Sequence, residues 1–152
     1  MLPDPRKNKI VLATDHAGFE LKEKVKSYLQ GNGYTVEDFG AFEYDSNDDY
    51  PDFILPAAHV VGNSDHAFGI IFGGSGQGEA MAANRVKGVR AAVYYDGPED
   101  IVRLSRQHNN ANILSLGARF LSIEKAIRVI DLWLHEPFVG DRHLRRISKL
   151  DA

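Results

Sequence analysis

A loop with glycine at positions 73, 74, 76 and 78 leads directly to the carboxylate of Glu79. The loop follows the apolar segment 68–72. Because glycine has no side chain, such a loop turns sharply and aims several backbone N–H groups at one anionic oxygen. Glu79 would then supply a proton acceptor beside that oxygen. Taken alone, a glycine-rich loop is equally typical of a flexible, solvated segment, so the surrounding residues decide between the two interpretations.

The composition restricts the size of the protein and the chemistry open to it. The chain has 152 residues, 43% hydrophobic and 26% charged, which is typical of one domain spanning residues 1–152. It has no cysteine, which excludes disulfides, thiol nucleophiles and thiolate metal sites. The net charge of −3 argues against nucleic-acid binding. We see neither a membrane span of roughly 20 apolar residues nor a secretory signal, and expect a cytoplasmic protein without membrane contact.

Strand and helix patterns alternate along the chain. Short apolar segments predict five strands, at residues 9–14, 35–39, 68–72, 90–94 and 113–116. Helical spacing of apolar residues predicts helices near 21–29, 53–61, 79–84, 101–105, 123–134 and 142–150. Strands separated by helices require a parallel sheet covered on both faces. The sequence therefore predicts a three-layer α/β/α, Rossmann-like fold with a five-stranded parallel sheet, and leaves the strand order open.

Polar residues follow three of the predicted strands. Asp15 and His16 follow the first strand, Glu79 follows the third through the glycine loop, and Arg119 follows the fifth. Ligands of open parallel sheets bind outside the carboxyl ends of the strands. We therefore expect these side chains to surround one site at that rim of the sheet.

The polar residues belong to a series of short motifs. These are Asp-His-Ala-Gly at 15–18, Asp-Tyr-Pro at 49–51, the loop and Glu79 with Ala-Ala-Asn-Arg at 82–85, Arg-Gln-His-Asn-Asn at 106–110, Gly-Ala-Arg at 117–119 and Arg-His-Leu-Arg-Arg at 142–146. In this order they resemble the type B ribose-5-phosphate isomerases, over residues 9–150. The resemblance implies an aldose-ketose isomerase of the pentose phosphate pathway, which interconverts ribose 5-phosphate and ribulose 5-phosphate without a metal or organic cofactor.

The proposed reaction needs a base that moves a proton between neighbouring carbons through an enediolate, and one carboxylate can do this. We interpret Glu79 as that base and the N–H groups of residues 74–78 as donors to the developing oxyanion. Some members of the family have a cysteine base at the end of the third strand, where this chain has Gly73. The chain thus resembles the branch with a glutamate base. Burial would raise the pKa of Glu79 and amides at a helix start would lower it, and the sequence does not decide which prevails.

Ser75 raises a different possibility, the nucleophile of a hydrolase. That pattern requires glycine two residues after the serine, and Gln77 stands there. We therefore interpret Ser75 as a hydrogen-bonding partner of sugar oxygens.

His108 and Asn109 end a predicted helix and need a bend in the chain to reach the rim. By resemblance, His108 protonates the ring oxygen of the cyclic sugar, Asp15 accepts the proton of the anomeric hydroxyl, and Asn109 contacts the sugar. From the residues alone, a helix that ends in His-Asn is as well explained by a C-terminal cap.

Cations for the phosphate group are concentrated near the end of the chain. By resemblance, Arg142 and Arg146 reach into the site of a partner subunit and act with Arg119 and His16, which implies a homodimer or a dimer of dimers. Taken singly, each arginine would be expected on a solvated helix surface. The substrate-binding set implied by the resemblance is Asp15, His16, Gly74, Ser75, Gly76, Gln77, Gly78, Asn109, Arg119, Arg142 and Arg146.

Other patterns do not fit the sites they superficially suggest. Asp45, Asn47 and Asp49 have the spacing of calcium ligands, but Tyr50 and Pro56 occupy the EF-hand's glycine and glutamate positions. We interpret this loop as solvated, with Tyr50 lining the site, and predict no metal. The glycines lack the Gly-x-Gly-x-x-Gly spacing of a dinucleotide site.

Two questions stay open from the sequence. Relatives within the family act on tetrose and hexose phosphates, and the length of the pocket is not readable from the chain. A non-catalytic sensor of sugar phosphates would use the same loop and arginines. A positioned base at Glu79 and an acid at His108 favour an enzyme, because binding alone requires neither.

Overall fold

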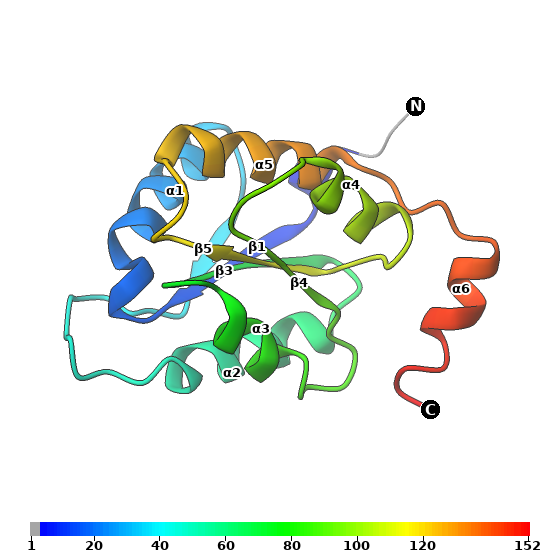
Figure 1. Ribbon diagram of the computed structural model, residues 1–152, viewed down its shortest axis with the longest axis horizontal. Helices are drawn as coiled ribbons and strands as arrows, with labels where there is room; N and C mark the ends of the chain where they lie inside the picture. Colours follow the sequence, from blue (N-terminus) through cyan, green and yellow to red (C-terminus); the bar gives the residue numbers. More distant parts are fainter. Residues whose placement is uncertain (1–3) are drawn as a thin grey trace.

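The computed structural model describes residues 4–152, which contain one sheet of five strands (Figure 1). The strands are β1 (Lys9–Thr14), β2 (Val36–Asp38), β3 (Ala67–Gly73), β4 (Ala91–Tyr94) and β5 (Ile113–Gly117). Their order across the sheet is β2-β1-β3-β5-β4, and every neighbouring pair is parallel. The predicted five-stranded parallel sheet is confirmed.

Helices cover both faces of this sheet. The α-helices of the described chain are α1 (Phe19–Gly31), α2 (Pro51–Gly62), α3 (Gln77–Ala83), α4 (Asp100–Gln107), α5 (Ile123–His135) and α6 (Arg142–Ile147), of which the first five cover the sheet. The first, fourth and fifth lie on one face, and α2 and α3 lie on the other (Figure 1). The predicted three-layer α/β/α fold is confirmed. Within residues 4–152, no helix is both long enough and apolar enough to cross a membrane.

The central strands are buried on both faces, which explains their continuous apolar sequence. Along β1, Ile10 and Leu12 join the core under α1 and α5, whereas Val11 and Ala13 join the core over α2. Successive side chains of a strand point to opposite faces, so β1 contributes to both cores. Trp133 of α5 is fully buried in the first of them.

The strand order changes direction between β1 and β3. From β1 the chain crosses to β2 on one side, and all later strands lie on the other side, beginning with β3. At such a point the loops that leave neighbouring strands diverge and a crevice forms at the carboxyl ends. Asp15, His16 and the glycine loop leave β1 and β3 at this crevice.

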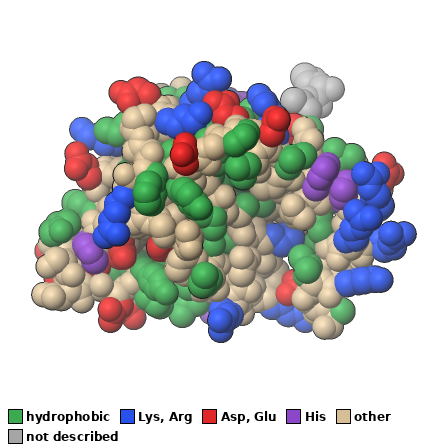
Figure 2. Space-filling model, in the orientation of Figure 1, with side chains coloured by type: hydrophobic (Ala, Val, Ile, Leu, Met, Phe, Trp, Pro, Cys, Tyr) green, Lys and Arg blue, Asp and Glu red, His purple; other side chains and the backbone are tan. Residues whose placement is uncertain are grey.

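The last helix, α6, lies apart from the layers at one end of the molecule (Figure 1). The predicted helix over 142–150 is longer than the observed one, which ends at Ile147 and continues as turns. Short helices take most of their stability from packing, and Leu144 and Leu150 remain 58% and 68% exposed. Figure 2 shows Lys and Arg side chains gathered over this helix. Its outer surface is therefore both apolar and basic.

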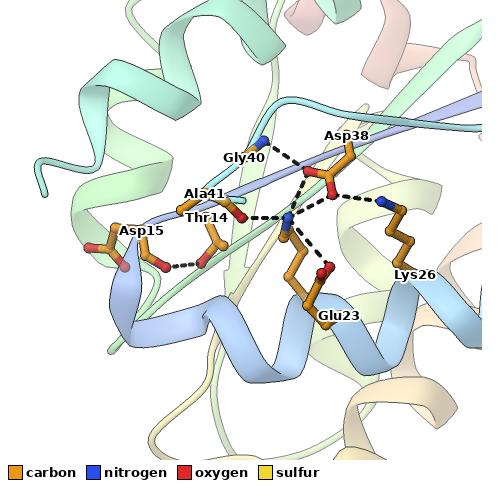
Figure 3. A network of polar contacts seen from close by, with 8 residues as sticks. Thr14, Asp15, Glu23, Lys26, Asp38, Gly40 and Ala41 are labelled. Atoms are coloured by element: carbon orange, nitrogen blue, oxygen red, sulfur yellow. Dashed lines mark hydrogen bonds and ion pairs between the residues drawn. The ribbon is translucent and has the colours of Figure 1, made fainter. Parts of the chain in front are cut away.

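A buried ion pair connects α1 to the chain that follows β2. Lys22 is fully buried, and its Nζ donates to both carboxylate oxygens of Asp38 at 2.7 Å and to the carbonyl of Ala41 at 2.8 Å (Figure 3). The N–H of Gly40 also donates to Asp38, and the carbonyl of Gly40 accepts from the N–H of Thr14. The network fixes this segment against the carboxyl end of β1.

Replacing Lys22 should destabilise the fold, because it leaves the buried carboxylate of Asp38 with only the half-buried Lys26 as a cationic partner. We expect Lys22→Met to lower the free energy of unfolding by about 3 kcal/mol. Lys24→Met, on the exposed side of the same helix, should change it by less than about 0.5 kcal/mol. Urea unfolding at one protein concentration measures both. Equal stability of the two variants would contradict the assigned role.

Candidate active site

The glycine loop forms the junction between β3, which ends at Gly73, and α3, which begins at Gln77. Gly76 precedes the helix with a φ of 80°, a conformation that favours glycine. A Cβ at Gly76 would also lie 3.0 Å from the backbone carbon of Leu116. The Oγ of Ser115 donates to the carbonyl of Gly76 at 2.6 Å. The neighbouring strand β5 therefore holds the loop in place.

The carboxylate of Glu79 lies directly against the backbone of Gly73. A Cβ on Gly73 would lie 1.8 Å from Oε1 and 2.0 Å from Oε2 of Glu79, which is sterically impossible. Position 73 must therefore be glycine while Glu79 takes this conformation. A cysteine at position 73 and the carboxylate of Glu79 in its observed position therefore exclude each other.

The carboxyl group of Glu79 is buried and has few hydrogen bonds to offset its loss of water. It is 5% exposed, and its Oε2 has no hydrogen-bond partner among the described residues. Burial, and then the negative charge of Asp15, raise the pKa of Glu79 from its ordinary 4.5 to about 7, while its own backbone N–H and Arg119 act in the opposite direction. Burial thus prevails over the amides at the helix start. A carboxyl with this pKa can both accept and return a proton near neutral pH.

A cavity of about 660 Å³ lies in front of Glu79, at the crevice between β1 and β3. Its walls come from the loops after β1, β3 and β5, as predicted, and from the segment around the start of α2, of which the sequence indicated only Tyr50. The lining residues are Asp15, His16, Ala17, Asp48, Asp49, Tyr50, Pro51, Asp52, Gly74, Ser75, Glu79 and Arg119. Six of the predicted site residues therefore surround one space.

The loops after β1 and β5 contribute side chains of opposite charge. The carboxylate of Asp15 accepts from the N–H of Ala17 at 2.9 Å and begins a short 3-10 helix, η2 (His16–Gly18). The guanidinium of Arg119 lies over Gly74, where a Cβ would come within 2.9 Å of Cζ. The N–H of Arg119 also donates to the carbonyl of Gly74 at 3.1 Å. Because position 74 is glycine, the exposed side chain of Arg119 can lie close to the loop.

The rest of the loop is positioned by short contacts. A Cβ on Gly78 would lie 2.7 Å from the ring of Tyr50, so glycine lets this ring close one side of the cavity. Gln77 is exposed at the start of α3, and its N–H donates to the Oγ of Ser75 at 3.3 Å.

His108, Asn109 and Arg146 do not reach this cavity within one chain. They line a separate hollow of about 260 Å³ together with His143, Ile147 and Leu150. Arg142 is exposed on the same helix, α6. The expected bend is present, because Asn110 has a φ of 45°, but it leads into β5. A crossover helix runs back along its sheet, so α4 ends near the amino ends of the strands. Within one chain, His108 and Asn109 therefore lie away from the rim that carries Glu79.

The turn that carries His108 is held by a buried arginine, which the sequence analysis did not assign. Arg106 is 8% exposed, and its Nη1 donates to the side chain of Asn110 at 2.9 Å and to the carbonyl of Ala111 at 2.7 Å. The ring of His108 stacks on that of His143, with 4.2 Å between centroids. Burial and then the proximity of His108 lower the pKa of His143. The sequence indicated Arg106 only through its position in the Arg-Gln-His-Asn-Asn motif at 106–110.

Comparison with known proteins identifies the relatives of this architecture. A model of the Ribose/Galactose Isomerase family matches residues 10–150. The chain belongs to this family. Probable ribose-5-phosphate isomerase B of Mycoplasma genitalium is 44% identical over 142 residues, which cover 93% of this chain and 92% of the relative. Ribose-5-phosphate isomerase B of Mycobacterium tuberculosis (strain H37Rv) is 38% identical over 143 residues, 93% of this chain and 87% of the relative.

Solved structures of the family have the same fold. The crystal structure of ribose-5-phosphate isomerase B from Mycoplasma genitalium with bound ribulose-5-phosphate superimposes with a TM-score of 0.89 at 43% identity, covering 93% of both chains. The ribose 5-phosphate isomerase from Thermotoga maritima gives a TM-score of 0.88 at 47% identity, covering 95% of this chain and 97% of that one.

One group of residues in the described chain has the spacing of metal ligands. Asp15, His16 and Asp48 each offer an atom, and these atoms lie within 4.8 Å of one another. The Nδ1 of His16 already forms a 2.6 Å hydrogen bond with Asp48, which explains the proximity without an ion. The absence of a metal stays a prediction.

The buried carboxyl of Glu79 should make stability depend on pH. Its pKa is higher in the folded chain, so the folded state binds the proton more tightly and loses stability as the pH rises from 4.5 to about 7. At pH 8, Glu79→Gln should therefore unfold with a free energy higher by about 3 kcal/mol than the unchanged chain. This difference in the free energy of unfolding should decrease towards pH 4.5. Urea unfolding from pH 4.5 to 8 measures it, and a difference independent of pH would contradict the raised pKa.

Proposed function

We propose that the chain is an aldose-ketose isomerase that interconverts ribose 5-phosphate and ribulose 5-phosphate. The observation that carries this proposal is the buried carboxylate of Glu79, with a pKa of about 7, beside the glycine loop. The bound ribulose-5-phosphate in the Mycoplasma genitalium relative supports the choice of substrate. A sensor would need no group with this pKa at this place, so the enzyme is favoured.

Glu79 is the base that carries the proton in the proposed reaction. It removes the proton from the carbon next to the carbonyl and returns it to the neighbouring carbon, with an enediolate between the two steps. Backbone N–H groups of Gly74, Ser75, Gly76, Gln77 and Gly78 stabilise the oxyanion of this intermediate. A well-placed general base typically contributes about 100- to 10,000-fold to the rate. The reaction needs no redox cofactor, because it moves only protons and the bonding electrons of the sugar.

The site requires groups that a single chain does not supply to it. Of the described residues that line the main cavity, five are carboxylates and two, His16 and Arg119, carry or can carry positive charge. A sugar phosphate is itself an anion, so further cations are needed. Exposed Arg142 and Arg146 on α6 are available, and this helix has an uncovered apolar surface. We infer a homodimer, alone or within a dimer of dimers, in which α6 packs on the partner subunit.

In this dimer the second hollow of one chain meets the main cavity of the other. His108 of the partner subunit then protonates the ring oxygen, while Asp15 accepts the proton of the anomeric hydroxyl. Asn109 of the partner subunit contacts the sugar. Arg142 and Arg146 of the partner subunit bind the phosphate with His16 and Arg119. The basic hollow and the acidic cavity are complementary in charge, which favours this assembly.

Proton transfer can be tested with tetrose, pentose and hexose aldose phosphates in deuterated water. We expect deuterium incorporation, fastest with ribose 5-phosphate, and a loss of at least about 100-fold in Glu79→Gln. Mass spectrometry of the products measures both. If no aldose phosphate exchanges, but ribose 5-phosphate still binds by calorimetry, the chain is a sensor.

The shared site can be tested by mixing two inactive variants. In the proposed dimer, each site takes Glu79 from one chain and His108 from the other. A mixed dimer of Glu79→Gln and His108→Asn therefore keeps one site in which both residues are intact. Unfolding and refolding an equal mixture should restore about a quarter of the unchanged activity, because half of the dimers are mixed. Each variant refolded alone is the control. If the mixture is no more active than the controls, Glu79 and His108 do not act across a subunit interface.

A further inference from the structure

The loop between β2 and α2 contains an acidic residue whose side chain is largely shielded from solvent, although the sequence indicates a solvated loop. The side chain of Asp48 is 9% exposed, whereas Asp45 and Asp49 of the same loop are exposed. A buried carboxylate requires a partner that offsets the loss of water. Its Oδ2 has no hydrogen-bond partner within residues 4–152. Interactions that offset the loss of water must therefore come from Oδ1.

Those contacts come from a single residue. Oδ1 of Asp48 lies 2.6 Å from Nδ1 of His16 and accepts the backbone N–H of His16 at 3.1 Å. With both its backbone and Nδ1 held by one oxygen, the imidazole has little freedom to rotate. Nδ1 must carry the proton to donate to this carboxylate, and Nε2 is the ring nitrogen that stays available for another contact. The edge of the Tyr44 ring also lies against His16, with 5.9 Å between centroids.

His16 lies where two hollows meet. One is the cavity in front of Glu79, and the other is a hollow of about 640 Å³ bordered by α1. Arg119 lines both as well. A cation held at this point would face an anion that occupies the cavity.

We propose that Asp48 is a positioning residue for substrate binding: it orients His16 and keeps it protonated, so that the imidazolium donates from Nε2 to the phosphate of the substrate. This inference rests on the proposed function, because it assigns the phosphate to the His16 and Arg119 end of the cavity. In a cavity whose charged lining residues are mainly carboxylates, a neutral His16 would leave Arg119 as the only cation that one chain contributes among the described lining residues.

The charged groups around His16 agree with this role. Asp48 raises the pKa of His16 most, burial opposes it, Asp15 raises it further and Arg119 lowers it. The titratable and charged groups that α1 contributes to the adjoining hollow are Glu20, Glu23 and Lys24. Two of these three are acidic and also favour the protonated ring. Removing the charge of Asp48 is therefore expected to move His16 towards the neutral form at physiological pH.

The variant Asp48→Asn tests this role, because it preserves the shape and the Oδ1 acceptor but removes the charge. The Michaelis constant for ribose 5-phosphate should rise about tenfold or more at pH 8 and by clearly less at pH 6, because acid favours the protonated ring of His16 with or without the charge of Asp48. Turnover should stay within about twofold at both. Asp45→Asn is the matched control, since the side chain of exposed Asp45 accepts only from the N–H of Asn47 in the same loop.

Two further measurements separate positioning from a structural effect. The imidazole of His16, followed by NMR in the presence of a chelator, should titrate at lower pH in Asp48→Asn than in the unchanged chain. In a His16→Asn background, Asp48→Asn should add nothing to the Michaelis constant, because the group through which it acts is gone. Asp48→Ser, with a smaller neutral side chain, repeats the series if the asparagine variant folds poorly.

The proposal is overturned if the ratio of Michaelis constants does not change between pH 6 and 8, or if turnover falls while the Michaelis constant stays the same. It is also overturned if the titration of His16 is unaffected by Asp48→Asn. Failure of the proposed function looks different. The unchanged chain would then be inactive on every aldose phosphate, while the NMR titration would still report whether Asp48 controls His16.

Discussion

The contact between the carboxylate of Glu79 and the backbone of Gly73 is the constraint around which the site is built. It leaves the acidic group only 5% exposed and its Oε2 without a hydrogen-bond partner among the described residues. An ionised carboxylate in such a place is unfavourable, so the proton is retained to about pH 7. The pKa that suits a base for carbon acids is thus a consequence of packing, and the packing requires a residue without Cβ at position 73.

The sheet supplies the rigidity that this contact needs. β1 and β3 lie side by side at the point where the strand order reverses, which brings Asp15 and the glycine loop to one crevice. β5, on the other side of β3, holds the loop through Ser115 and through the backbone of Arg119. The glycines are therefore not a sign of flexibility here. Gly73, Gly74 and Gly78 allow the close approach of the Glu79 carboxylate, the Arg119 guanidinium and the Tyr50 ring, respectively.

The charged side chains that the proposed site would use are divided between two regions of the chain. Acidic groups dominate the main cavity and basic groups dominate α6. Within one chain the two regions are separate. Joined in a dimer, they would form a site in which an anionic substrate is balanced by cations. The carboxylate of Asp48 fits the same scheme, since its hydrogen bond raises the pKa of His16, one more residue of the acidic cavity.

The sequence by itself determined the order and type of the elements, the α/β/α class and the series of motifs, because periodicity and glycine spacing are local properties. It also predicted that Asp15, His16, the glycine loop, Glu79 and Arg119 would gather at one rim. Only the tertiary structure decided the strand order, the burial of Lys22 and Asp48, the pKa of Glu79 and the separation of His108 from that rim. Each of these depends on which distant residues come into contact. Burial and charge pairing are properties of that packing, and residue spacing along the chain does not encode them directly.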